Sequence, residues 1–125
     1  MRVLLAQANQ ASARIFRTAL TAAGHEVLAA GSGEHAIRIA LQEHPDVIVT
    51  ELALPIVDGW QVLHVLRTYS PTKVIPVVAL TSEAEAETET RALGAGFRAC
   101  INVSAAPEDL VKVVEDVARH GAGEV

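Results

Sequence analysis

Polar side chains that could do chemistry stand at the ends of apolar runs in this 125-residue sequence. Gln7, Glu51 and Thr81 each follow directly on a short aliphatic stretch. Ser82, beside Thr81, would act as a nucleophile only with a base nearby, and no histidine falls at another of these ends. The sequence therefore predicts no catalytic residues and no enzymatic activity of its own.

Metal-binding patterns are absent from the sequence. The five histidines show no i, i+4 pair and none neighbours a cysteine or a carboxylate cluster, so we expect scattered surface histidines. Cys100 is the only cysteine, which rules out an intramolecular disulfide and a thiolate metal site. The stretch 31–33 (Gly-Ser-Gly) lacks the spacing of a phosphate-binding loop. We expect no metal and no cofactor.

The elements that must position these residues alternate between strand and helix. Strands are predicted at 3–6, 26–30, 47–50, 76–80 and 99–102, and helices at 12–23, 34–43, 59–69, 83–93 and from Pro107 onward, with a turn at 70–72. Such alternation implies an α/β fold, a three-layer doubly wound five-stranded parallel sheet. In such a fold, ligands gather at the carboxyl ends of the strands, where Gln7, Glu51 and Thr81 fall.

Composition and charge restrict the possible partners. The net charge is −5, and no stretch is strongly basic, so nucleic-acid binding is not expected. The first apolar run is too short for a signal peptide or a membrane span, which predicts a reducing, cytoplasmic setting. We expect one domain at 1–120 and a flexible tail at 121–125, although that ending would also suit a linker to an output domain.

Three stretches of the sequence resemble the receiver domains of response regulators. Residues 45–51 with 54–59 look like the third strand and following loop of that family, 75–81 looks like the fourth strand, and 91–96 looks like the stretch before strand five. The resemblance runs from Arg2 to about Arg119. It implies a flavodoxin-like sheet in the order 2-1-3-4-5 and a role in two-component or phosphorelay signalling.

The family's chemistry is phosphoryl transfer from a partner kinase to an aspartate, assisted by Mg²⁺ and a lysine. By resemblance, the family's acidic pair falls on Gln7 and Ala8, its acceptor on Glu51 and its lysine on Val103. One carboxylate in place of three makes a poor Mg²⁺ site. Each missing electrostatic contact typically costs on the order of 3 kcal/mol of transition-state stabilisation. The sequence therefore predicts no useful phosphorylation and no Mg²⁺ binding.

The family's switch residues are also altered. The proline after the lysine falls on Ser104, which puts the family's cis peptide bond in doubt, and the switch aromatic falls on Cys100. The hydroxyl at the end of strand four is kept as Thr81. Glu51 is expected to extend toward Thr81, where it would either imitate an acylphosphate or remain a solvated carboxylate at a decayed site.

These observations predict an atypical pseudo-receiver that acts through phosphorylation-independent protein–protein interaction. The expected contact face is the helix at 83–93, the strand at 99–102 and the helix from Pro107, with a homodimer as one form. Glu83, Glu85, Glu87 and Glu89 are read as a solvated helix start or as part of that face. Trp60 is expected to pack at the edge of the core over the loop that contains Pro55, or else to anchor a partner.

Two alternatives stay open at this point. The first alternative to the pseudo-receiver is a weakly competent receiver that is phosphorylated at Glu51. The second is a small-molecule sensor. Gln7, Ala8 and Val103 leave a less polar cleft that would suit a neutral ligand or a nucleotide.

Overall fold

The computed structural model describes residues 1–82 and 86–119, in which five parallel strands form one sheet. The order is β2-β1-β3-β4-β5, as predicted. The strands are β1 (Arg2–Ala6), β2 (Glu26–Ala30), β3 (Val47–Glu51), β4 (Val77–Thr81) and β5 (Ala99–Asn102). Because every neighbouring pair is parallel, the carboxyl ends of all five strands lie along one edge of the sheet.

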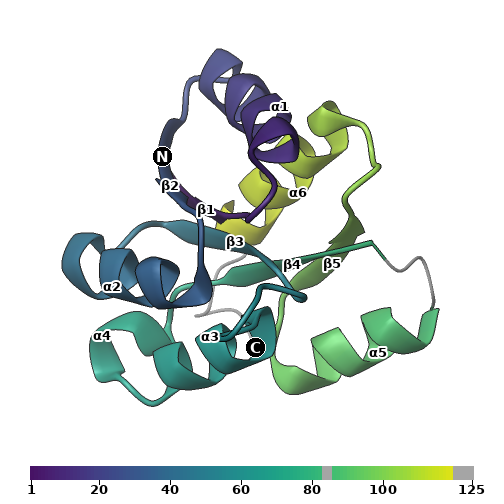
Figure 1. The fold of residues 1–125 in the computed structure, drawn as a ribbon. Coiled ribbons are helices and arrows are strands. Elements are labelled where there is room, and N and C mark those ends of the chain that lie inside the picture. The colour runs from purple at the N-terminus through teal and green to yellow at the C-terminus, as the bar shows by residue number, and fades with distance from the viewer. Residues whose placement is uncertain (83–85, 120–125) are drawn as a thin grey trace.

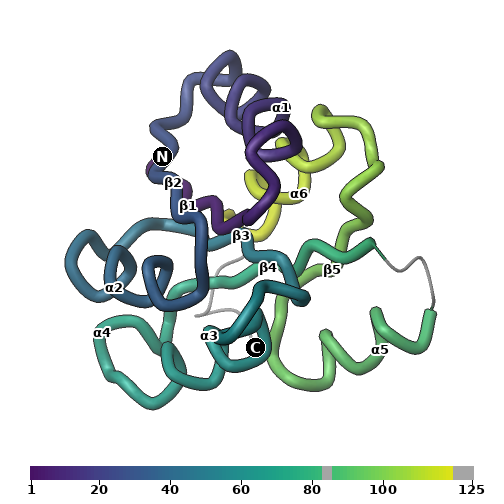
Figure 2. Tube along the Cα trace, viewed as in Figure 1, coloured from purple at the N-terminus to yellow at the C-terminus, as the bar shows by residue number. Residues whose placement is uncertain are grey.

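Helices cover both faces of this sheet and make a three-layer structure (Figure 1). On one face lie α1 (Gln10–Ala22) and α6 (Pro107–Arg119), and on the other lie α2 (Gly33–Glu43), α3 (Gly59–Arg67), α4 (Ser70–Lys73) and α5 (Ala86–Ala95). The first and last of these helices along the chain, α1 and α6, lie side by side (Figure 2). The predicted doubly wound α/β fold is confirmed.

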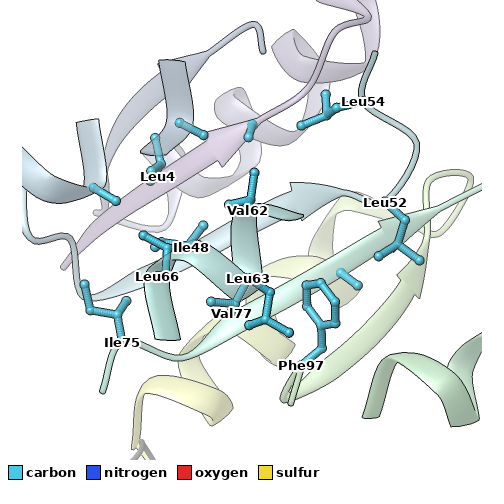
Figure 3. Packing of buried hydrophobic residues seen from close by; sticks show 14 of the residues in the cluster. Leu4, Ile48, Leu52, Leu54, Val62, Leu63, Leu66, Ile75, Val77 and Phe97 are labelled. Carbon is cyan, nitrogen blue, oxygen red and sulfur yellow. The ribbon is translucent and has the colours of Figure 1, made fainter. Parts of the chain in front are cut away.

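Alternate residues of the central strands feed two separate apolar cores, because successive side chains of a strand point to opposite faces. The core under α3 combines strand residues with that helix (Figure 3), among them Leu4, Ile48, Val77, Val62, Leu63 and Leu66. The core under α1 and α6 contains Leu5, Val49, Leu80, Phe16, Leu20, Leu110 and Val114. Each such fully buried side chain contributes about 1.5–3 kcal/mol, so the two cores together hold the layers in place.

The starts of three helices follow from local sequence. Asn9 and Ser32 cap α1 and α2, since their side chains accept hydrogen bonds from Ser12 N–H (3.0 Å) and His35 N–H (3.1 Å). Asp58 caps α3 in a reciprocal arrangement, in which Gln61 N–H donates to Asp58 Oδ1 and Asp58 N–H donates to Gln61 Oε1. Such caps fix where each helix departs from the sheet edge.

The structure corrects the prediction in two connecting segments. The turn predicted at 70–72 is part of the short helix α4, where the buried Thr72 hydroxyl donates to Leu66 O at 2.8 Å. Helix α5 continues through Gly94 to Ala95 and stops before Gly96, whose φ of 119° favours glycine. The predicted residues 83–85 of that helix and the predicted tail at 121–125 lie outside the described residues.

At the amino ends of the strands, Arg2 joins β1 to the last residue of α2 and to the segment before β3. Its Nη2 lies 2.6 Å from Glu43 Oε1, its Nη1 donates to Glu43 O at 2.7 Å, and its backbone N–H donates to Asp46 Oδ2 at 2.8 Å. The Glu43 hydrogen bond, aided by neighbouring acidic groups, raises the pKa of the Arg2 guanidinium. Within the described residues, no helix combines the length and hydropathy that a membrane crossing requires.

Candidate functional site

The positions singled out by the sequence meet at the carboxyl edge of the sheet. Gln7 and Ala8 follow β1, Glu51 ends β3, Thr81 ends β4, and Val103 follows β5. The register pairs Ala6 with Thr50 and Glu51 with Leu80, which sets the ends of β1, β3 and β4 side by side. The fold therefore brings these residues into one neighbourhood, as parallel sheets do with the ends of their strands.

The Glu51 side chain is directed at the loop after β1. Its Oε1 accepts a hydrogen bond from Ala8 N–H at 2.7 Å. The sequence predicted a reach toward Thr81 on β4, but β3 lies between β1 and β4, so the observed contact is on the other side. The expected direction of the Glu51 side chain was wrong. It was inferred from the length of the side chain alone, and it did not include Ala8 N–H, the backbone donor in the loop between β1 and α1.

Gln7, which the resemblance places at the first position of the family's acidic pair, has a buried side chain. It is 1% exposed, and its Nε2 lies 2.9 Å from Ser12 Oγ. Among the described residues, Gln7 Oε1 has no hydrogen-bond partner. Ala8, at the second position, is exposed and offers only a methyl group and the backbone N–H that Glu51 uses.

These groups do not fit the Mg²⁺ ion that the fold family uses. Mg²⁺ takes an octahedral set of oxygen ligands, normally from carboxylates and water. Among the described residues at the ends of β1, β3 and β4, one carboxylate is present, Glu51, which already accepts from Ala8 N–H, together with one buried amide oxygen at Gln7. In residues 1–82 and 86–119, no group of three or more histidines, cysteines, aspartates or glutamates is placed to hold a metal ion.

Val103, to which the resemblance assigns the position of the family's lysine, is an apolar residue. Val103 packs against the core under α1 and α6, and its N–H donates to Thr81 O at 2.9 Å. Ser104 turns back on Asn102, since its backbone N–H (2.8 Å) and its hydroxyl (2.6 Å) both lie in hydrogen-bonding range of Asn102 Oδ1. The described residues contain no cis peptide bond, so the Val103–Ser104 bond is trans. No cationic side chain follows β5 at this point.

Cys100, to which the resemblance assigns the position of the switch aromatic, lies in the edge strand β5. It is half-buried against the core under α3. Burial raises the pKa of the Cys100 thiol, and the nearby Glu89 carboxylate on α5 raises it further. A thiol held in its neutral form is a small apolar side chain here.

The loop between β3 and α3 is shaped by a close backbone approach at Gly59. A Cβ on this residue would lie 2.3 Å from Glu51 O and 2.9 Å from Leu52 Cα, so only glycine fits without displacement. At the tip of the loop, Ile56 has a φ of 67° and is 98% exposed, while Val57 N–H donates to Pro55 O at 2.8 Å. The loop thus holds the end of β3 close to the start of α3.

Trp60 packs at the core edge, as predicted, but its ring contacts differ from the expected ones. Its ring meets Phe97 edge to face, with centroids 5.6 Å apart, and Arg91 lies 5.1 Å from the Trp60 centroid. Arg91 belongs to α5, and Phe97 lies between α5 and β5, whereas the expected contact was with the loop that contains Pro55. A lone tryptophan gave no sequence signal for these partners, because they lie more than 30 residues away along the chain.

His25 corrects the expectation of surface histidines. Its side chain is 11% exposed, its Nε2 lies 2.8 Å from Glu115 Oε2, and its Nδ1 lies 3.2 Å from the Met1 amine. It therefore joins the N-terminus and the start of β2 to α6. This cluster lies at the amino end of the sheet, away from the residues described above.

Comparison with known proteins agrees with this geometry. Residues 3–115 match the family model of the response regulator receiver domain, and the chain belongs to that family. It is 32% identical over 100 residues to the polar-differentiation response regulator DivK of Brucella ovis, covering 80% of this chain and 81% of that protein. It is also 32% identical over 96 residues to the transcriptional regulatory protein HprR of Escherichia coli, covering 77% of this chain and 42% of that protein.

Solved structures show the same fold. The chemotaxis response regulator CheY4 of Vibrio cholerae superposes with a TM-score of 0.86 at 26% identity, covering 93% of this chain and 97% of that one. A response regulator from Desulfuromonas acetoxidans gives a TM-score of 0.87 at 26% identity, covering 94% and 96%. The chain is thus a receiver domain of two-component signalling.

Proposed function

We propose that this chain is an atypical receiver domain that works by binding other proteins and is not switched by phosphorylation. The observation that carries the proposal is the hydrogen bond between Glu51 Oε1 and Ala8 N–H. It engages the one carboxylate at the family's acceptor position with a backbone donor of the chain itself. The carboxylate at this position is then held by the chain itself, and the loop after β1 has a fixed partner.

The groups around Glu51 support the same conclusion. A phosphoryl group brings additional negative charge, which needs cations or several donors to balance it. Here Val103 and Ala8 contribute no charge, and Gln7 contributes a neutral amide. A transferred phosphoryl group would lie beside Glu51 with little compensation, so the domain is expected to have neither Mg²⁺ chemistry nor an activity of its own.

The proposed contact face is formed by α5, β5 and α6. Strand β5 is an edge strand whose four residues are all partly exposed, which leaves its outer side open to a partner. Helix α5 adds the acidic residues Glu87 and Glu89 in its first turn, and Leu93 is 46% exposed on the same helix. Such a mixed acidic and apolar face suits a cytoplasmic signalling protein or a second copy of this chain.

Exposure to acetyl phosphate tests the proposal directly. The full chain is incubated with Mg²⁺ and acetyl phosphate, and its intact mass is measured. The expected result for the native chain is no added phosphoryl group. The positive control is a variant that carries the family's residues, Gln7→Asp/Ala8→Asp/Glu51→Asp/Val103→Lys. Uptake by the native chain that disappears in Glu51→Ala would overturn the proposal and favour a weakly competent receiver.

A further inference from the structure

The tip of the loop between β3 and α3 exposes an isoleucine almost completely. Ile56 is 98% exposed, whereas no other large apolar side chain among the described residues exceeds 59%. Its neighbours Ala53 and Pro55 are exposed as well. Single exposed aliphatic residues are ordinary on protein surfaces, so exposure alone assigns no role to Ile56.

The backbone at Ile56 is strained. Val57 N–H donates to Pro55 O at 2.8 Å, which closes a three-residue turn around Ile56, whose φ is 67°. Turns of this kind with a positive central φ are rare. A β-branched residue fits them poorly, since glycine or asparagine adopts the same φ with less strain. Strained residues cluster at functional sites, and Ile56 gains no burial within its own chain that would offset the strain.

A cleft lies beside this loop. Its volume is about 330 Å³, which exceeds that of one aliphatic side chain. Leu54 and Asp58, which flank the strained turn in sequence, both belong to its lining, and Leu52 and Trp60 add apolar wall. Because Ile56 is almost fully exposed, it does not occupy the cleft of its own chain.

The charge around the loop and the cleft is balanced. Residues 52–57 carry no charged side chain, and the cleft adds one carboxylate, Asp58, and one cation, Arg91. A surface that pairs with its own copy has to be nearly neutral, because two identical charged surfaces repel each other. The face formed by α5, β5 and α6 meets this condition less well, since α6 carries four carboxylates and two cations.

We propose that this loop and cleft pair with a second copy of this chain, in a dimer that exchanges Ile56 side chains. Because Ile56 and the cleft adjoin on one surface, a two-fold axis between them places Ile56 of each copy in the cleft of the other. Such a contact is identical from both sides and closes at two copies. The face formed by α5, β5 and α6 then stays available to a different protein, and the pairing does not depend on phosphorylation.

Sedimentation of the full chain over a range of concentrations measures the pairing, and we expect a reversible equilibrium between monomer and dimer. In Ile56→Asn the dissociation constant should rise by about a hundredfold, since both copies lose a buried aliphatic side chain. At a dilution where both chains are monomeric, Ile56→Asn should unfold at a higher urea concentration than the native chain, because asparagine tolerates the positive φ. Ile15→Asn removes the 55% exposed isoleucine of α1, and as the matched control it should leave the dimer intact.

A second variant tests the cleft. Ala53→Trp places a bulky ring at an exposed position of the lining and leaves Ile56 unchanged, so this variant alone should also stay monomeric. Mixing it with Ile56→Asn restores one of the two contacts, because one chain supplies the isoleucine and the other the open cleft. The mixture should therefore associate more tightly than either variant alone, and circular dichroism shows that each variant is folded. A native chain that stays monomeric at every concentration, native-like association of Ile56→Asn, or no gain on mixing folded variants would overturn the proposal.

Discussion

Glu51 Oε1 and Ala8 N–H are joined by a 2.7 Å hydrogen bond that connects the end of β3 to the loop after β1. A carboxylate that accepts from a backbone N–H forms a charge-assisted bond, which is stronger than one between neutral groups. The same bond occupies the position where the family places its chemistry. It gives the Glu51 carboxylate a structural contact between β3 and the loop after β1.

Removing this bond should lower stability. In Glu51→Ala we expect the free energy of unfolding in urea to fall by about 1 kcal/mol, since Ala8 N–H then has only water as its partner. Glu51→Gln retains an acceptor oxygen and loses the charge, so its loss should be smaller. Equal stability of Glu51→Ala and the native chain would contradict a structural role for the bond.

Restoring carboxylates should create a cation site that the native chain lacks. In Gln7→Asp/Ala8→Asp/Glu51→Asp, three carboxylates meet at the ends of β1 and β3, and we expect Mg²⁺ binding by isothermal titration calorimetry. The single variant Glu51→Asp is the matched control and should bind no Mg²⁺. Binding of Mg²⁺ to the native chain would refute the account of the site given above.

The Cys100 thiol should make stability decline in alkaline solution. Its pKa is raised in the folded state, so its contribution is fully present below the ordinary thiol pKa of about 8.5 and is lost as the pH rises through the folded-state pKa. Urea unfolding of the native chain and of Cys100→Val should therefore diverge above that pH. Iodoacetamide should also alkylate Cys100 more slowly than a cysteine in an unfolded peptide, and an equal rate would argue against the raised pKa.

The two ring contacts of Trp60, with Phe97 and with Arg91, should contribute unequally to the free energy of unfolding. Phe97 is 2% exposed, so Phe97→Ala should cost about 3–5 kcal/mol of unfolding free energy. Arg91→Ala should cost less than about 1 kcal/mol, since the cation lies over an accessible ring. Trp60 fluorescence followed through denaturation measures both, and Arg38→Ala is the control for loss of an exposed arginine. A larger loss in Arg91→Ala than in Phe97→Ala would reverse this order.

The order of the elements could be predicted from the sequence because it depends on local apolar patterns. The runs ending at Ala6, Thr50 and Leu80 are buried on both faces, which gives continuous aliphatic stretches that read clearly as strands. The short helix α4 was missed because its stability comes from a buried contact, the Thr72 hydroxyl on Leu66 O, which no local pattern reveals.

The site was only partly predictable for a similar reason. Residue identity, read through the resemblance to the family, predicted that Gln7, Ala8 and Val103 fall where the family carries charged groups. It did not show that Glu51 turns toward Ala8, because a backbone N–H is present at every position and its direction depends on the loop. The hydrogen bond between His25 and Glu115 joins residues 90 positions apart, so its detection required the packing of α6 beside α1.

The ties of Arg2 to Glu43 and Asp46 lie at the rim of the sheet opposite to Glu51. Together with the two aliphatic cores, they hold the layers together at a distance from the Glu51–Ala8 hydrogen bond. A substitution at Gln7, Ala8 or Val103 leaves the contacts of Arg2 in place. A receiver fold can therefore keep part of its stability far from the strand ends where the family carries out phosphoryl transfer.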